Sequence, residues 1–188
     1  MKQKQNLSKK VFFPRILKTL LVTFLLVEMS SQSIAVEPHF SNAEIKQWIK
    51  HQKEENKQIT CLAENIFFEA RNTDRYEMKK VANVTMNRLK SPKYPKTICE
   101  IVHQHKQFSW TTNFNNNIQR ITRLIRKNIF EDSAWKSAKS IAYLTVHGYV
   151  QDETHGAIFY HTNYVHKPHS WGKVTLVLKT KYDSFYIL

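Results

Sequence analysis

The spacing of the apolar residues changes once along the chain, and this change constrains the fold more than any other feature. From residue 41 to about residue 147, apolar residues recur at intervals of three and four, as on one face of an α-helix. From residue 157 onward they form short runs rich in β-branched and aromatic residues, separated by Gly, Pro and Asp, as in strands. Helices followed by strands predict an α+β domain.

Capping signals divide the helical part into segments. Ser41 with Glu44, and Asp74 with Glu77, have the spacing of a capping box, which satisfies the first backbone NH groups of a helix. The polar run at residues 51–58 is expected to separate the first helix from the second. The expected helices lie within residues 36–59 and at 61–71, 74–90, 97–102, 118–130 and 133–147, and the expected strands at 157–161, 174–178 and 185–188.

Residues 1–35 have the composition of an export signal. Six Lys or Arg residues precede or adjoin the apolar run Leu20–Val27, and Ser33-Ile34-Ala35 supplies the small-residue pattern that a signal peptidase cuts. The run is shorter than the roughly 20 residues that span a bilayer. We therefore expect cleavage near Ala35 and delivery to the periplasm or cell envelope. An uncleaved interfacial anchor is the alternative.

The charge balance indicates the kind of partner. Without the six basic residues and one acidic residue of the signal, the chain keeps 23 of its 29 basic and 14 of its 15 acidic residues. A basic exported protein is expected to bind envelope polyanions, and export argues against nucleic acid. Only three glycines occur, and they are scattered, which excludes glycine-rich phosphate loops. A basic binding protein without catalysis is the competing class.

The chain has two cysteines, Cys61 and Cys99. Because disulfides persist in exported proteins, an even pair favours one bond between them. Two buried free thiols are the alternative.

The segment Cys61–Arg71 is apolar enough to be a buried helix, yet it carries Glu69. Leu62 and Ile66 share one helix face, and Glu69 follows close to that face. Partial desolvation favours the protonated form of a carboxyl group, which a general acid requires. In the other interpretation, Glu69 reaches solvent or pairs with Arg71.

Several short motifs follow one another in a defined order after residue 60. They are Cys61–Arg71, Val81–Arg88, Tyr94-Pro95, Thr97–Cys99, Gln107–Trp110 and Gly156–His161 with Trp171. In this order they resemble the SleB-type cell-wall hydrolases. The resemblance covers residues 60–188, after a lead-in and helix at 36–59, and implies a lysozyme-like, mostly helical domain with a small C-terminal antiparallel β-sheet.

The resemblance implies cleavage of the bond between N-acetylmuramic acid (MurNAc) and N-acetylglucosamine (GlcNAc) in peptidoglycan, without a cofactor, and Glu69 as the catalytic acid. A two-carboxylate hydrolase needs a second acid roughly 5–10 Å away. Glu64 lies about 140° around the helix from Glu69, and Glu77 is engaged in a cap. A lytic transglycosylase needs one acid, because the C6 hydroxyl of MurNAc attacks C1. We therefore predict a lytic transglycosylase giving 1,6-anhydro-MurNAc, with a muramidase-type hydrolase as the alternative.

Amide, hydroxyl and aromatic side chains suit a glycan groove. The predicted substrate-binding residues are Gln107, Phe108, Ser109, Trp110, Tyr160 and His161. Core packing is nevertheless the preferred interpretation for the rings of Phe108 and Phe159. Arg71 and Asn87 are predicted to support the site, and Asn87 and Arg88 suit a structural role equally well.

The motif departs from the family at one point. Members usually continue Glu-Ala-Arg with Gly-Glu, where this chain has Asn72-Thr73. If the family's glycine has a left-handed backbone conformation, Asn72 can adopt it as well. Because Thr73 stands where the family has Glu, a mechanism with two carboxylates that used this Glu is excluded. A catalytically weak, basic envelope-binding protein is therefore a further alternative. The histidines match no tight ligand pair, and no metal is predicted.

Overall fold

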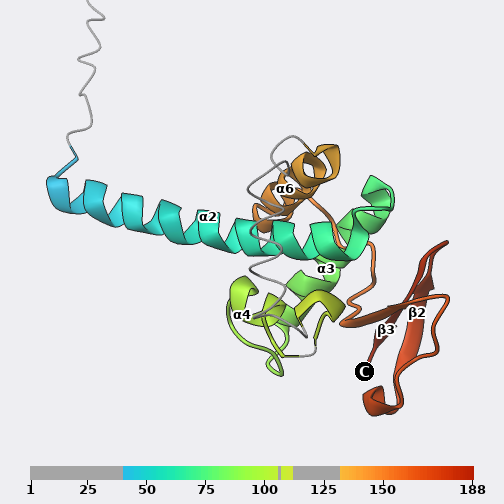
Figure 1. Cartoon of the computed structure of the whole chain (residues 1–188). Helices are drawn as coiled ribbons and strands as arrows, with labels where there is room; N and C mark the ends of the chain where they lie inside the picture. Colours follow the sequence, from blue (N-terminus) through green and yellow to red (C-terminus); the bar gives the residue numbers. More distant parts are fainter. Residues whose placement is uncertain (1–39, 106, 112–131) are drawn as a thin grey trace, which may run out of the picture. The chain divides into compact units, whose positions relative to one another are not determined.

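Figure 1 shows the computed structural model, which describes residues 40–105, 107–111 and 132–188. The expected export signal and the expected helix at residues 118–130 lie outside these ranges. Helices come first and a small sheet last, so the predicted α+β class is confirmed. The elements are α2 (Asn42–Ala70), α3 (Arg75–Lys90), α4 (Ile98–Val102), η1 (Ser109–Thr111), α6 (Ser133–Val146), β1 (Phe159–Thr162), η3 (His169–Trp171), β2 (Thr175–Lys179) and β3 (Asp183–Ile187).

Helix α2 is continuous through the polar run at residues 51–58, so the predicted break there is wrong. This run contains no glycine or proline, and its Lys, Glu and Gln residues are strong helix formers. Gln58 Nε2 also donates a hydrogen bond to Glu54 Oε1, one turn earlier, at 2.7 Å. The polar run marks a stretch in which the helix is mostly exposed to solvent. It does not mark a helix end, because its residues favour helical backbone.

The hydrophobic core forms where the second half of α2 meets α3 and α6. Leu62 and Ile66 of α2 are fully buried, as are Ala82 of α3 and Ala142 of α6. Burying one Leu or Ile side chain stabilises a fold by roughly 1.5–3 kcal/mol. The apolar face predicted for residues 61–71 is therefore the centre of the core, and Glu69 lies at its end.

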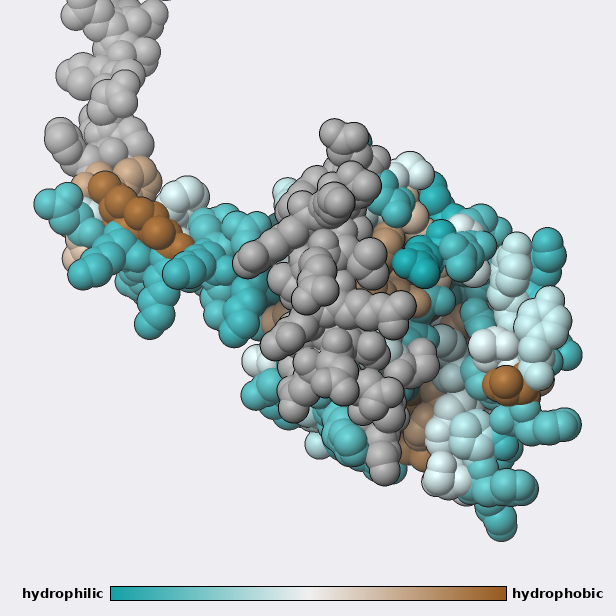
Figure 2. Space-filling view, in the orientation of Figure 1, coloured by the Kyte–Doolittle hydropathy of each residue, from teal (hydrophilic) through white to brown (hydrophobic). Residues whose placement is uncertain are grey.

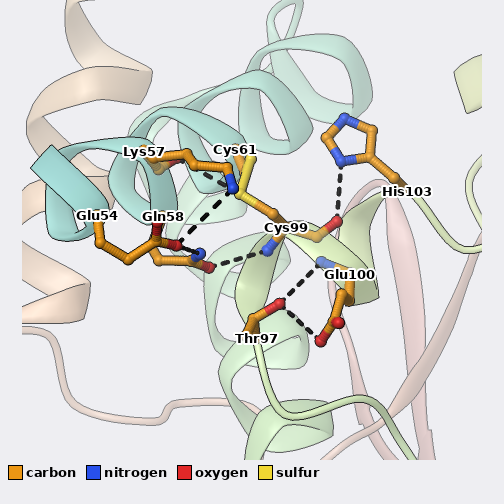
Figure 3. Close-up of polar contacts among 8 residues, drawn as sticks. All are labelled: Glu54, Lys57, Gln58, Cys61, Thr97, Cys99, Glu100 and His103. Carbon is orange, nitrogen blue, oxygen red and sulfur yellow. Dashed lines mark hydrogen bonds and ion pairs between the residues drawn. A yellow bond between two sulfur atoms is a disulfide. The ribbon is translucent and has the colours of Figure 1, made fainter.

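A disulfide between Cys61 and Cys99 joins α2 to α4, as predicted (Figure 3). The two Cα atoms are 5.2 Å apart. Beside the bond, the backbone NH of Cys99 donates to Gln58 Oε1 at 3.0 Å. These contacts fix the short helix α4, which has little material of its own to hold it, against the long helix.

Helix α3 has the cap predicted for it, and α4 is capped by Thr97. Asp74 accepts hydrogen bonds from the backbone NH groups of Tyr76 and Glu77 at 2.9 and 3.0 Å. Thr97 accepts from the backbone NH of Glu100 and donates to its carboxylate (Figure 3). Local sequence alone therefore determines where these two helices begin.

The sheet has the strand order β1-β3-β2, and both pairs are antiparallel. Phe185 of β3 is fully buried against Val84 of α3. The connection to the helices continues through Arg88 Nε, which donates to the carbonyl of Ile158, just before β1, at 2.8 Å. Helix α3 thus fixes the position of β1, which carries Tyr160. None of the helices described here has both the length and the apolar character to cross a membrane.

Candidate active site

Glu69 lies in the last turn of α2 and contacts the sheet. Its Oε2 accepts a hydrogen bond of 2.9 Å from the phenol of Tyr160, which lies on β1. Both side chains are half-buried. Residues far apart in the sequence therefore meet where the buried face of α2 ends.

Glu69 and Tyr160 line a cleft of about 500 Å³ between the helices and the sheet. This volume falls within the usual range of small-ligand sites. Glu69 is the only carboxylate among the lining residues that the structure describes, which are Glu69, Arg88, Gln107, Phe108, Phe159, Tyr160, His161, Thr162, Val165, Ser170 and Trp171. Four of the predicted substrate-binding residues, Gln107, Phe108, Tyr160 and His161, are thus brought together with the predicted acid.

Tyr160 is held in its protonated form. Burial, and then the negative charge of Glu69, raise the pKa of the Tyr160 phenol well above its usual value. The phenol therefore keeps its proton at any pH near neutrality. It remains a donor that orients the Glu69 carboxyl group.

Arg88 of α3 is a buried positive charge at the same cleft, with 4% of its surface exposed. Its guanidinium carbon lies 5.0 Å from the centre of the Phe108 ring, a cation–π arrangement. Burial lowers the pKa of Arg88, whereas nearby Tyr94, Tyr160 and Glu69 raise it. An arginine keeps its charge under such conditions, so Arg88 faces Glu69 and Tyr160 as a cation.

One wall of the cleft is aromatic. The rings of Phe159 and Trp171 lie 5.0 Å apart, and His161 Nε2 lies 2.9 Å from the hydroxyl of Tyr186. Phe159 is half-buried and lines the cleft, so the prediction that its ring belongs to the core is wrong. Phe108 is 4% exposed, which agrees with core packing, although one side of its ring reaches the cleft.

Two of the other predicted site residues, Trp110 and Arg71, do not line the cleft. Trp110 packs on Phe68 at 4.9 Å between ring centres, and its Nε1 donates to Asn65 at 3.2 Å. Arg71 is exposed above the ring of Phe67. Ser109 belongs to η1, and its side chain is not among the described parts of the structure.

Asn87 is buried and organises a loop. Its amide donates to Asp152 Oδ2, Thr154 Oγ1 and the carbonyl of Ala157 at 3.0–3.2 Å. These contacts hold residues 152–157 immediately before β1. Asn87 therefore supports the position of β1 and lies outside the cleft itself.

Asp183 is an acid near the site that no sequence motif indicated. It begins β3 opposite Thr162 of β1. Burial, and then the charge of Glu69, raise the pKa of the Asp183 carboxyl group, and His161 lowers it. Asp183 therefore lies within electrostatic reach of Glu69, although it does not line the cleft. Only the pairing of β1 with β3 brings it there, and the sequence carries no local signal of that proximity.

The turn after Glu69 is closed by Thr73. The Thr73 hydroxyl and backbone NH both donate to the carbonyl of Ala70, at 2.7 and 3.0 Å. Among the non-glycine residues described, only His155 has a positive φ, so the left-handed conformation considered for Asn72 is not used. Thr73, which stands where the family has Glu, thus closes the turn with hydrogen bonds, and Asn72, which stands where the family has Gly, needs no unusual backbone conformation.

Metal ligands do not cluster in the described ranges, where no group of three or more His, Cys, Asp or Glu residues is placed to hold an ion. The arrangement around Glu69 is instead one carboxyl group, a phenol donor and a buried cation beside an aromatic wall. This arrangement suits acid–base chemistry on a neutral, hydroxyl-rich substrate.

Comparison with known proteins identifies the family. The model of the family described as cell wall hydrolase matches residues 72–186, which is more than half of the chain. The chain belongs to the cell wall hydrolase family. Among solved structures, it is similar to the catalytic domain of the germination-specific lytic transglycosylase SleB from Bacillus anthracis, with a TM-score of 0.50 and 19% identity over 69% of this chain and 93% of that one. A search of curated proteins found no match.

These findings confirm the SleB-type resemblance and the predicted mostly helical fold with a small C-terminal sheet. Membership of a cell wall hydrolase family supports an enzyme that acts on peptidoglycan. Together with the disulfide, it also agrees with a location outside the cytoplasm. Glu69 lies just before the matched residues, so its role rests on the geometry described above.

Proposed function

We propose that this cell wall hydrolase is a lytic transglycosylase that uses Glu69 as its single catalytic acid and base. The observation that carries the proposal is that, among the described residues that line the cleft, Glu69 is the only carboxylate. Tyr160 orients it through a 2.9 Å hydrogen bond. A mechanism that needs one carboxyl group therefore fits the cleft better than one that needs two.

The reaction proceeds in two proton transfers. Glu69 donates its proton to the oxygen of the MurNAc–GlcNAc bond, and the bond between that oxygen and C1 of MurNAc breaks. The C6 hydroxyl of the same MurNAc then forms a bond to C1, and its proton returns to Glu69. The products are a 1,6-anhydro-MurNAc end and a free GlcNAc hydroxyl, with no water consumed. Because Tyr160 donates to Oε2, we assign the transferred proton to Oε1.

The remaining cleft residues are proposed to bind the glycan strand. Trp171 and Phe159 offer flat faces to sugar rings, and Gln107, His161 and Tyr160 offer polar groups to the N-acetyl and hydroxyl groups. Arg88 stabilises the Glu69 carboxylate between the two transfers, because it places a positive charge near it in a setting of low dielectric.

A muramidase-type hydrolase is the second candidate, and the position of Asp183 favours it. The negative charge of Glu69 raises the pKa of Asp183, so a second carboxyl group lies within electrostatic reach of the proposed acid, and hydrolysis requires a pair of carboxyl groups. The Asp183→Asn variant separates the two mechanisms. Hydrolysis predicts a large loss of activity in this variant, whereas transglycosylation predicts that anhydro products are still formed.

The location of the enzyme is part of the proposal. Residues 1–35 are proposed to act as a cleaved export signal, which delivers the domain to the compartment that contains peptidoglycan. The excess of basic residues would then favour contact with envelope polyanions.

The proposal is tested on purified sacculi with the Glu69→Gln variant, which keeps the size of the side chain. Wild type is expected to release anhydro-muropeptides, and the variant is expected to bind sacculi without releasing them. Glu64→Gln is the matched control, because Glu64 lies on the same helix beside His103 and outside the cleft. Equal release by wild type and Glu69→Gln would remove Glu69 from the mechanism, and binding without release by wild type itself would indicate a binding protein.

A further inference from the structure

The first turns of α2 expose an apolar stripe. Ile45, Trp48 and Ile49 are 43%, 63% and 55% exposed, and Phe40, just before the helix, is 66% exposed. Figure 2 shows strongly hydrophobic residues on this part of the molecule, directly beside hydrophilic ones. At 3.6 residues per turn, Ile45, Trp48 and Ile49 fall within a sector of about 100°. They form one face of the helix, and no described element covers it.

Lysines lie along one edge of this stripe. Lys46, Lys50, Lys53 and Lys57 are all exposed, and they fall about 80–140° from Ile45 around the helix axis. Glu55 lies on the other side of the helix, where it forms an ion pair with His147 at 3.4 Å. Glu54 lies next to the lysine edge and pairs with Lys57 at 3.9 Å, which leaves Lys46, Lys50 and Lys53 as the lysines nearest the stripe. The helix therefore has an apolar face, a cationic edge beside it and a mixed polar back.

We propose that the N-terminal half of α2 binds the surface of an anionic phospholipid membrane, with its axis in the plane of the interface. Trp and Ile side chains insert at the boundary between headgroups and acyl chains, and the lysines beside them reach lipid phosphates. The apolar stripe is too short and too narrow for a spanning helix. The cationic edge favours an anionic surface over a second copy of the same helix, whose lysines would repel it.

The consequence is that the cleft would work next to the membrane surface. Glu69 and the stripe belong to the same continuous helix, 20 residues from Ile49 to Glu69. At 1.5 Å per residue this corresponds to roughly 30 Å along the axis. Because the axis lies in the plane of the interface, this length displaces the cleft along the membrane surface and not away from it.

The test uses the full chain with a single environment-sensitive fluorophore, since both native cysteines are in the disulfide. One protein carries the label at Ile49→Cys, in the stripe, and the matched control carries it at Gln47→Cys, about 160° away around the helix. Vesicles are made of phosphatidylglycerol with phosphatidylcholine, or of phosphatidylcholine alone. The same labels are also read in protein without lipid over a range of concentrations.

With phosphatidylglycerol vesicles, the emission of the label at position 49 is expected to shift to shorter wavelength, while the label at position 47 stays in water. Replacing Lys46, Lys50 and Lys53 by Gln is expected to weaken the affinity for these vesicles. The expected loss is roughly fivefold per lysine, at about 1 kcal/mol each. No vesicle-dependent shift at position 49, or equal shifts at both positions, would overturn the proposal. A shift at position 49 that appears without lipid and grows with protein concentration would also overturn it, because a second copy would then cover the stripe.

Discussion

Replacing Tyr160 by Phe tests the role of the phenol that holds Glu69. The substitution removes the hydroxyl that donates to Glu69 Oε2 at 2.9 Å. It keeps the ring, which stacks on Phe185 with 5.8 Å between ring centres. The packing of β1 against the core should therefore survive, and the change is confined to one hydrogen bond.

The expected magnitude follows from the strength of that bond. A hydrogen bond to a charged group contributes about 1.5–3 kcal/mol, and 1.36 kcal/mol corresponds to one pH unit. Because the phenol stabilises the ionised carboxylate, its loss favours protonated Glu69 and moves the alkaline fall of activity to higher pH. Water that enters the cleft would partly replace the lost hydrogen bond, so we expect the alkaline fall of activity to move by about one pH unit.

The assay is the pH dependence of anhydro-muropeptide release from sacculi. Tyr186→Phe is the matched control, because its hydroxyl contacts His161 rather than Glu69. The control should keep the wild-type alkaline limb. A profile of Tyr160→Phe that coincides with wild type, or a shift to lower pH, would refute the assignment of Tyr160 as the group that orients Glu69. Equal shifts in both variants would show that the effect does not depend on the hydrogen bond to Glu69.

Three further predictions concern stability and binding. Replacing Cys61 and Cys99 by Ser is expected to lower the free energy of unfolding by roughly 4 kcal/mol in the chain-entropy model. Urea denaturation measures this loss, and a denaturation midpoint that neither the substitution nor a reductant changes would contradict it. Trp171→Ala should raise KM for soluble glycan strands about fivefold, for a loss on the order of 1 kcal/mol, with kcat little changed; an unchanged KM would remove the ring from the binding surface. Burial raises the pKa of Asp152, but hydrogen bonds from Thr154 and neighbouring groups outweigh it and lower the pKa overall. Its contribution to stability is therefore present near neutrality and lost as the pH falls through the lowered pKa, and Asp152→Asn should remove that part of the acid sensitivity in thermal melts.

Local sequence signals predicted much of the helical part. Asp74 caps the helix that it was expected to cap, and the short helix expected at 97–102 begins after Thr97, because a cap depends on a few neighbouring residues. The break within residues 51–58 was wrong, because a helix continues wherever the backbone allows it, whether or not a face is buried. Exposure of one face says little about where a helix ends.

The site was predictable only in part, because its members meet through tertiary contacts. Glu69 and Tyr160 were both identified from motifs, and the fold brings them together. Asp183 and the exposed side of Phe159 depend on how β1 pairs with β3 and how the sheet packs on α3, and no local pattern encodes that. Trp110 packs on Phe68 and does not line the cleft, which the sequence could not predict, since an aromatic residue in a polar segment suits a binding surface and a core plug equally well.

The oxygen isotope content of the products tests the central claim most directly. Sacculi are digested in water enriched in ¹⁸O, the products are reduced at once, and the masses of the released muropeptides are measured. Transglycosylation by Glu69 predicts 1,6-anhydro ends that contain no oxygen from the solvent. Reducing MurNAc ends that carry one solvent ¹⁸O would contradict it, and would assign the cleft to a hydrolase with a second catalytic group.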